Sequence, residues 1–543
     1  MKRSVGPMTR WPTPPWLVLV LLFLLGGCAS RPINPPISHA DHNAGYRFIT
    51  HVQESMDNES LVILAFSGGG TRAAAFSYGV LEFLRNTEVV GPKGNKSRLL
   101  DRVGVITGVS GGSFTALAYG LYGDKLFDDY EQRFLKRNVQ GEIVSRTLNP
   151  TYWPALWSSA WGRSELAADI YDEILFNGAT FGDLNRGNGP FIVASATDIS
   201  TGTRLPFTQA SFDVLCADLS AMRLSRAAAA SSAVPVVLSP ITLNNYGGTC
   251  GYSAPAWIKP FVGSVDAPRP AARATRHLKE EAEFGDGANR PYIHLVDGGI
   301  SDNLGMRSVL DAIEVMDALQ SVGLPTPLDH IRRIVVLVVN SLSTPKEEWD
   351  KSESPPGTME ILVKAAGVPI DHYSYEATEL LRDKQAHWQS MRRLRESPAF
   401  AAKLGPAETT ALRTPDTTIY AIDVSFAQVT DKAELDYLNE QPTSFHLSDE
   451  AVDRLRAAAG KIIMASPEFQ RLLRDVGSTI VAPTPAGPAA VVPPSEVAPA
   501  GDPNTTCDEL LQSGPGKPQL PCPDVGQKRV SATGARDDIV PRD

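Results

Sequence analysis

Two stretches of the chain repeat one pattern, in which a run of apolar residues ends at glycines and is followed by apolar residues at helical spacing. The first stretch runs over Leu61–Phe66, stops at Ser67–Gly70 and continues as a helical pattern from Thr71 to Arg85. The second has an apolar run at Val103–Thr107, a glycine-rich segment at Gly108–Gly112 and a helical pattern from Ser113 to about Leu121. Because buried strands read as short apolar runs and helices as a 3.6-residue period, both stretches predict strand, glycine loop and helix.

Later apolar runs continue this alternation along the chain. They predict strands at Phe191–Ala196, Tyr292–Val296, Ile334–Val339 and Thr418–Val424. Apolar strands separated by helices are typical of a mostly parallel sheet that is covered on both faces. The predicted fold class is therefore α/β, with a layered α/β/α arrangement.

Beyond Asn340 the chain becomes more helical and more charged. Helices are predicted at Met359–Ala366, Tyr373–Glu396 and Ser448–Val476. The strand predicted at Thr418–Val424 lies between them and is expected to return to the sheet. We therefore interpret this part as a helical extension of the same domain.

Changes in composition divide the chain into five parts. A leader is predicted at 1–27, a tether rich in Pro, Ser, Asn and His at 28–58, an α/β core at 59–345, the helical extension at 346–478, and a poorly ordered tail rich in Pro and Ala at 479–543. We find no internal repeat.

The overall composition excludes several classes of protein. With 43% hydrophobic and 21% charged residues, the chain is neither a disordered protein nor a membrane protein with many spans. Its net charge of -10 and the lack of a dense Lys/Arg block argue against a nucleic-acid partner, because a polyanion would be repelled. The oligomeric state cannot be read from these values.

The leader ends in a cysteine that is a candidate for lipid attachment. Basic residues precede a short apolar run at Trp16–Leu25, and Gly26 and Gly27 come directly before Cys28. A basic region followed by a short apolar run and small residues is the plan of a secretory signal peptide. The last residues resemble the bacterial lipobox, which implies lipidation of Cys28 and a membrane-surface location in the cell envelope. The residue after Cys28 is not Asp, which favours delivery to the outer membrane; a plain signal peptide is the alternative.

Four further cysteines follow the leader: Cys216, Cys250, Cys507 and Cys522. An exported chain meets an oxidising compartment, where disulfides persist. Pairing Cys216 with Cys250 and Cys507 with Cys522 is the most local of the three possible connectivities. Metal binding is disfavoured, because no pair has C-x-x-C spacing or histidines at ligand distance.

The first glycine loop, Ser67–Ala73, allows more than one interpretation. It lacks the lysine that a phosphate-binding P-loop needs, and it matches the dinucleotide pattern G-x-G-x-x-A only as a short motif. As an oxyanion hole it makes physical sense, because glycines let backbone N–H groups approach a ligand and a helix begins directly behind them. The candidate donors are Gly68, Gly69 and Gly70.

The second loop contains a candidate nucleophile. Gly108-Val109-Ser110-Gly111-Gly112 fits the G-x-S-x-G elbow, in which a sharp strand-to-helix turn exposes the serine Oγ. A serine nucleophile needs a base, but none of the nine histidines lies in a setting that singles it out. The better candidate is Asp297, which ends an apolar strand and precedes Gly298 and Gly299, although an aspartate at such a place also forms turns.

Taken in order, these motifs resemble the signature blocks of the patatin-like phospholipase family. The blocks are Gly68-Gly69-Gly70-x-Arg72, Gly108-x-Ser110-x-Gly112 and Asp297-Gly298-Gly299, with an Ala/Ser-rich stretch from Ser225 to Pro235 between the last two. The resemblance covers roughly residues 59–345, with weaker similarity through about residue 475. One departure follows Asn303, where many members have proline and this chain has Leu304.

The resemblance implies a serine acyl-ester hydrolase that uses a Ser110–Asp297 dyad without histidine, metal or cofactor. Gly68, Gly69 and Gly70 would bind the oxyanion. Arg72 would support the oxyanion or bind a lipid phosphate, or would simply pair with an acid on the helix surface. The implied substrate is a membrane lipid or another acyl ester. The alternatives are a catalytically silent envelope lipoprotein that binds lipid or a protein partner, and a nucleotide-binding protein.

Overall fold

The computed structural model describes residues 30–52, 59–158, 161–187, 189–254, 272–321, 324–325, 329–345, 349–403, 405 and 415–481. The chain divides into two compact units, Met1–Val481 and Ala482–Asp543. All described residues belong to the first unit, and the predicted leader, Cys28 and most of the predicted tail lie outside them.

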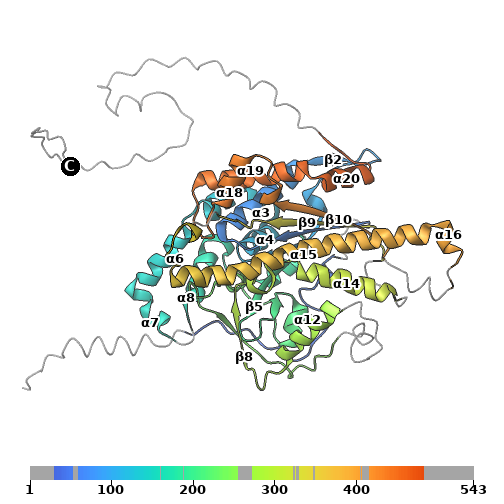
Figure 1. Cartoon of the computed structure of the whole chain (residues 1–543). Helices are drawn as coiled ribbons and strands as arrows, with labels where there is room; N and C mark the ends of the chain where they lie inside the picture. The colour runs from blue at the N-terminus through green and yellow to red at the C-terminus, as the bar shows by residue number, and fades with distance from the viewer. Residues whose placement is uncertain are drawn as a thin grey trace, which may run out of the picture. The chain divides into compact units, whose positions relative to one another are not determined.

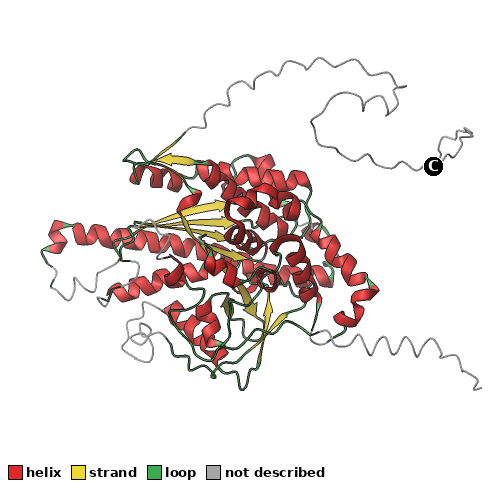
Figure 2. Ribbon diagram, turned by 180° about the vertical axis from the view of Figure 1, so that it is seen from behind, coloured by secondary structure: helices red, strands yellow, loops and turns green. Residues whose placement is uncertain are grey.

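The first unit is built on an eight-stranded sheet (Figures 1 and 2). The strand order is β10 (Thr418–Ser425), β9 (Arg333–Asn340), β1 (Ser60–Phe66), β4 (Val103–Val109), β5 (Phe191–Asp198), β8 (Tyr292–Val296) and β7 (Ile241–Asn244), with β6 (Arg204–Pro206) paired to β5. The five strands from β10 to β5 are parallel, and β6, β7 and β8 pair antiparallel. The six predicted strands are confirmed and the sheet is mostly parallel.

Helices cover both faces of this sheet, as the α/β/α prediction requires. Helix α3 (Gly70–Asn86) follows β1, and α4 (Gly111–Tyr122) follows β4. Figure 1 shows α3 and α19 (Asp449–Ala465) on one side of β9 and β10, and α14 (Arg307–Ser321) and α15 (Thr358–Glu396) on the other. Among the described residues, no helix is long and apolar enough to cross a membrane.

The remaining elements are shorter. The helices are α2 (Phe48–Val52), α5 (Leu126–Tyr130), α6 (Val139–Leu148), α7 (Trp153–Leu156), α8 (Arg163–Tyr171), α9 (Phe181–Arg186), α10 (Gln209–Val214), α11 (Leu224–Ser231), α12 (Ala272–Ala282), α13 (Gly299–Asp302), α16 (Pro398–Ala401), α18 (Lys432–Asn439) and α20 (Pro467–Asp475). A small antiparallel sheet joins β11 (Thr479–Ile480), β2 (Glu88–Val90) and β3 (Lys96–Arg98).

The helical extension differs from its prediction in two places. The two helices expected at 359–366 and 373–396 are one helix, α15, which continues through Pro369. The single helix expected over 448–476 is divided into α19 and α20 at Ser466, whose hydroxyl accepts the Phe469 N–H while Pro467 begins α20. Proline fits the first turn of a helix because its missing N–H is not needed there. Strand β10 pairs with β9 at the sheet edge, so the extension shares the sheet of the core.

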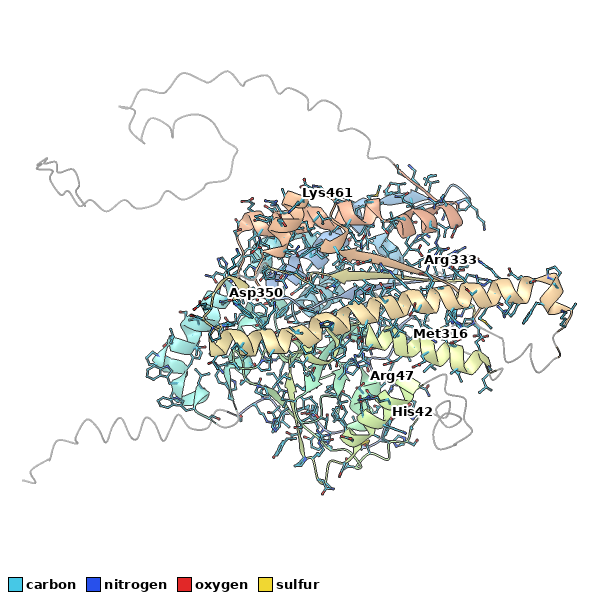
Figure 3. The ribbon with its side chains drawn as sticks, viewed as in Figure 1. His42, Arg47, Met316, Arg333, Asp350 and Lys461 are labelled. Atoms are coloured by element: carbon cyan, nitrogen blue, oxygen red, sulfur yellow. A yellow bond between two sulfur atoms is a disulfide. The ribbon has the colours of Figure 1, made fainter. Side chains whose placement is uncertain are left out.

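The segment Ser30–Val52, expected to be part of a tether, packs against the rest of the unit. Asn34 Nδ2 donates to the Asn244 carbonyl (2.9 Å), and the Asn244 N–H donates to Asn34 Oδ1 (2.8 Å). Tyr46 is buried, and its hydroxyl accepts the Ile192 N–H (2.7 Å). The described part of the predicted tether is therefore packed on the folded unit. Figure 3 shows His42 and Arg47 of this segment lying against the body of the unit.

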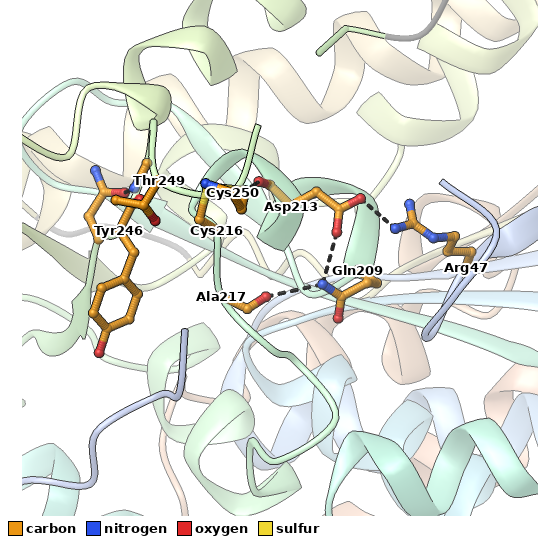
Figure 4. The surroundings of a disulfide bond; sticks show 10 residues. Arg47, Gln209, Asp213, Cys216, Ala217, Tyr246, Thr249 and Cys250 are labelled. Atoms are coloured by element: carbon orange, nitrogen blue, oxygen red, sulfur yellow. Dashed lines mark hydrogen bonds and ion pairs between the residues drawn. A yellow bond between two sulfur atoms is a disulfide. The ribbon is translucent and has the colours of Figure 1, made fainter. Parts of the chain in front are cut away.

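A disulfide between Cys216 and Cys250 holds the same region, which confirms one of the two predicted pairs. The carbonyls of these cysteines accept the N–H groups of Ile37 (2.9 Å) and Ala40 (3.1 Å). Figure 4 shows Arg47 reaching Asp213, which lies three residues before Cys216, and the two form a buried ion pair. The disulfide thus supports the surface on which the amino-terminal segment lies. Cys507 and Cys522 lie outside the described residues.

Candidate active site

Ser110 occupies a strained turn between β4 and α4. Its φ of 48° and ψ of -120° place a non-glycine residue in a region that L-amino acids rarely adopt. The surrounding polar groups hold this conformation: the Ser110 N–H donates to Ser231 Oγ (2.9 Å), and Ser113 Oγ donates to the Ser110 carbonyl (2.6 Å). Strained backbone of this kind is found at active sites, and this geometry is that of a nucleophile elbow.

The glycine after Ser110 is required by a close approach between the two glycine loops. A Cβ at Gly111 would lie 2.0 Å from the Gly70 carbonyl oxygen, well inside van der Waals contact. Gly70 itself has φ +60°, and a Cβ there would lie 2.3 Å from the Ser444 carbonyl oxygen. The two motifs found in the sequence are therefore packed directly against each other.

Asp297 meets Ser110 across 187 residues of sequence. Ser110 Oγ donates a 2.9 Å hydrogen bond to Asp297 Oδ2, and the Gly299 N–H donates a 2.8 Å bond to Oδ1. Asp297 does not reach Ser110 from the end of a parallel strand, as a mostly parallel sheet would suggest. Strand β8 is antiparallel to β5, with Val296 opposite Thr197, so Asp297 reaches the carboxyl end of β5 from outside the parallel part of the sheet.

Burial sets the protonation behaviour of Asp297. The residue is 7% exposed, and removal from water raises the pKa of its carboxyl group from its ordinary value of 3.8 to about 6. The hydrogen bonds from Gly299 and Ser110 favour the carboxylate and oppose part of this rise. The resulting group is a carboxylate at neutral pH that binds a proton more readily than an exposed aspartate.

The Ser110 and Asp297 side chains are paired without a histidine. Among the hydrogen bonds of the described residues, no histidine ring reaches either of them. His294, the histidine nearest to Asp297 in sequence, has its Nδ1 3.0 Å from Thr242 Oγ1. The arrangement is therefore a Ser–Asp pair rather than a Ser–His–Asp triad.

The first glycine loop presents N–H groups beside this pair. A Cβ at Gly68 would lie 3.3 Å from Ser110 Cβ, so the loop borders the serine directly. The structure differs from the expectation at Gly68, because its N–H donates to the Asn303 carbonyl (2.9 Å). No hydrogen bond within the described residues uses the N–H of Gly69 or Gly70. These two donors, at the start of α3, suit a developing oxyanion.

Arg72 is buried and donates hydrogen bonds to backbone carbonyls of the protein. It is 4% exposed, and its guanidinium donates from Nε to the Ser341 carbonyl (2.8 Å) and from one terminal nitrogen to the Gln441 carbonyl (2.6 Å). Burial lowers its pKa to about 10, so it remains protonated at neutral pH. Arg72 is therefore buried rather than exposed on the helix surface, and the nearby charge of Asp371 favours its protonated form. Arg72 ties the start of α3 to the segments after β9 and α18.

Three supporting residues were not assigned roles from the sequence. Ser231 accepts the N–H of Ser110, and Asn303 accepts the N–H of Gly68. Ser341 donates from Oγ to the Gly68 carbonyl (3.2 Å). Ser231 and Asn303 belong to stretches already noticed for their resemblance to the family, but only the folded chain shows which atoms they touch. Ser341 had no local signal, since it follows β9 as an ordinary loop residue.

The layered α/β fold, the serine elbow with its acidic partner and the glycine loop together are typical of serine hydrolases. The family model described as "Patatin-like phospholipase" matches residues 64–310. Residues 64–310 thus match a patatin-like phospholipase domain. The match supports lipid acyl hydrolysis as its general chemistry. No curated protein matches the chain in sequence.

Solved structures that match the chain include human GIVD cytosolic phospholipase A2, at 12% identity and a TM-score of 0.38, covering 79% of this chain and 66% of that one. The same human enzyme in complex with methyl gamma-linolenyl fluorophosphonate matches at 14% identity and a TM-score of 0.37, covering 80% and 62%. This chain therefore spans less than two thirds of the length of these proteins.

Proposed function

We propose that the chain hydrolyses acyl esters of membrane lipids through Ser110 and Asp297. The 2.9 Å hydrogen bond from Ser110 Oγ to Asp297 Oδ2, made at a strained elbow, is the observation that carries this proposal. In the first step Ser110 Oγ attacks the ester carbonyl carbon and Asp297 accepts the hydroxyl proton. The N–H groups of Gly69 and Gly70 stabilise the oxyanion, and Asp297 returns the proton to the departing alcohol.

The second step releases the acyl group. Asp297, again a carboxylate, accepts a proton from water as the water oxygen attacks the acyl-serine carbonyl. Collapse of the tetrahedral intermediate breaks the bond to Ser110 Oγ, which recovers its proton from Asp297. The products are a free carboxylic acid and the unmodified serine, so the cycle needs no cofactor.

The direct test measures fatty-acid release from defined phospholipids and from chromogenic acyl esters. The protein used lacks residues 1–28 and so keeps every described residue. Hydrolysis of at least one lipid ester is expected. A folded chain that releases no acid from any acyl ester would contradict the proposal and favour a silent lipid-binding protein.

The pH dependence of hydrolysis should report Asp297. The base must be a carboxylate, and burial raises the pKa of Asp297 to about 6. Activity is therefore expected to be low below this pH, to rise about tenfold per pH unit on the acid limb, and to level off above pH 6 to 7. A kcat/KM profile on a soluble ester checks this. An acid limb centred near 4, the range of an exposed aspartate, would contradict the assigned environment.

We also propose that lipidation of Cys28 anchors the protein to a membrane of the cell envelope, with the outer membrane favoured. The lipobox-like residues before Cys28 support this assignment. Labelled palmitate is expected to enter the full-length chain in cells and to be lost in Cys28→Ala. Equal labelling of the two chains would reject the anchor and leave the hydrolase proposal untouched.

A further inference from the structure

Exposed apolar side chains gather on α6, α7 and the loop that follows α11. They include Leu148 (68%), Trp153 (39%), Trp157 (64%), Val236 (54%) and Val237 (65%), and we refer to these five as the apolar rim. Figure 1 shows α6 and α7 together at one end of the first unit. Contiguous exposed apolar patches on soluble proteins mark interaction surfaces.

The loop that carries Val236 and Val237 is bonded to α8, the helix that follows α7. Arg163, which begins α8 shortly after α7, donates to the Val236 carbonyl (3.0 Å). The next residue, Ser164, donates its N–H to Ser239 Oγ (3.1 Å). The rings of Trp153 and Trp157 lie 5.8 Å apart. Helix α6 packs against both α7 and α8, and the loop of Val236 and Val237 is bonded to the start of α8, so these apolar side chains surround one group of packed helices.

The apolar rim begins next to the catalytic pair. The Asp297 N–H donates to the Ala233 carbonyl (3.0 Å), and the loop that carries Val236 starts at the next residue. Val236 has φ 74°, which is unusual for a β-branched residue. Such conformations persist where the surrounding structure enforces them, and they gather at functional sites. The strained loop presents Val236 and Val237 to solvent beside Asp297.

The amino end of the described chain lies at the same surface. Arg31 donates to the Thr242 carbonyl (3.1 Å), an oxygen that also accepts from Arg226, and Thr242 is three residues beyond Ser239 of the loop. Cys28 precedes Arg31 by three residues, which span at most about 10 Å when extended. A lipid on Cys28 would thus be confined to the neighbourhood of the apolar rim.

We propose that the apolar rim docks onto a lipid membrane and directs the Ser110 site towards the bilayer surface. Tryptophan is favoured at the membrane–water interface, and aliphatic side chains beside it gain by leaving water. A lipid anchor holds a protein at a surface without fixing its orientation, whereas a second, apolar contact does so. This inference rests on the proposed function, because docking of the apolar rim would bring a lipid substrate to the Ser110 site.

Vesicle flotation tests this surface. The chain lacking residues 1–28 is mixed with vesicles of phosphatidylethanolamine and phosphatidylglycerol, so that binding does not depend on Cys28. The rim variant carries Trp157→Glu and Val237→Glu. The matched control carries Leu394→Glu and Met464→Glu, two exposed apolar residues on α15 and α19. At least tenfold weaker vesicle binding is expected for the rim variant only, with hydrolysis of a soluble short-chain ester unchanged in both.

Two outcomes would overturn the docking proposal. Vesicle binding that is unchanged in the rim variant, or reduced equally in the control, would exclude the apolar rim as the membrane contact. Self-association that the rim variant alone loses, with vesicle binding intact, would assign the surface to a second copy of this chain. The soluble ester separates the two proposals: wild-type protein that binds vesicles through the rim but hydrolyses no ester would reject only the hydrolase function.

Discussion

Replacing Ser110 with alanine is expected to lower ester turnover by at least about 10³-fold, because it removes the hydroxyl that donates to Asp297 and attacks the acyl carbon. The backbone of the elbow should survive. The Ser110 N–H that Ser231 accepts is retained, and alanine meets the same backbone strain as serine. Initial rates on a soluble ester and on phospholipid vesicles, with the melting temperature of each protein, check this expectation.

A serine away from the elbow provides the control for this loss. Ser60 begins β1, at the amino edge of the sheet, and Ser60→Ala is expected to keep wild-type turnover. Wild-type turnover in Ser110→Ala would remove Ser110 from the mechanism. A comparable loss in Ser60→Ala would show that the assay reports damage to the fold rather than loss of the nucleophile.

Asp297→Asn is expected to lower turnover on the order of 10³-fold and to stabilise the fold at the same time. Asparagine has nearly the same shape, and its carbonyl can accept the Gly299 N–H that Asp297 accepts. It cannot take the proton of Ser110, so both acylation and deacylation lose their base. The loss should persist at every pH, whereas wild-type activity rises through about pH 6.

The expected stabilisation follows from the sign of the pKa shift. The pKa of Asp297 is raised from 3.8 to about 6 in the folded chain, so the fold favours the protonated form. Below the pKa of Asp297 in the unfolded chain, the carboxyl group is protonated in both the folded and the unfolded states, so it does not lower the free energy of unfolding. Above pH 6 the fold must hold a buried charge, at about 3 kcal/mol for a shift of about two units. Asp297→Asn should therefore melt higher than wild type at pH 8, with a smaller difference at pH 5.

A neighbouring aspartate serves as the control, because its substitution is expected to change the melting temperature in the opposite direction. Asp302 is also buried, but it accepts N–H groups from Met306 (3.1 Å) and Arg307 (2.9 Å) and lies 3.7 Å from Arg204. Asp302→Asn is expected to lower the melting temperature, because a charge-assisted set of bonds is weakened. If Asp297→Asn also melted lower than wild type at pH 8, the desolvated environment assigned to the Asp297 carboxylate would be wrong.

The elements that were predicted correctly are those that a short stretch of sequence is enough to indicate. Strands β1, β4 and β9 are buried on both faces and read as continuous apolar runs, so their positions and the glycine loops after them were visible. Strand β7 alternates between buried and half-buried residues over four positions and was missed. The antiparallel direction of β8 depends on its partner strand, which no local pattern specifies.

Long-range contacts explain the remaining differences. Arg72 reads as a helix-surface residue, yet its partners Ser341 and Gln441 lie 269 and 369 residues away. The residues after Ser30 have the polar, proline-rich composition of a linker, but Asn34 pairs with Asn244 across 210 residues. Ser110 and Asp297 were found because each stands in a short motif. Ser231 lies in an Ala/Ser-rich stretch whose composition predicts a helix. That composition does not predict that the Ser231 hydroxyl accepts the Ser110 N–H.

Covalent labelling by an alkyl fluorophosphonate, followed by mass spectrometry of the digested protein, directly tests whether Ser110 is the nucleophile and Asp297 its base. We expect one adduct per chain, located on Ser110. Labelling should be much slower in Asp297→Asn, because the carboxylate that accepts the Ser110 proton is absent. A fully folded protein that carries the adduct on another residue, or that labels Ser110 equally fast without the Asp297 carboxylate, would contradict the account.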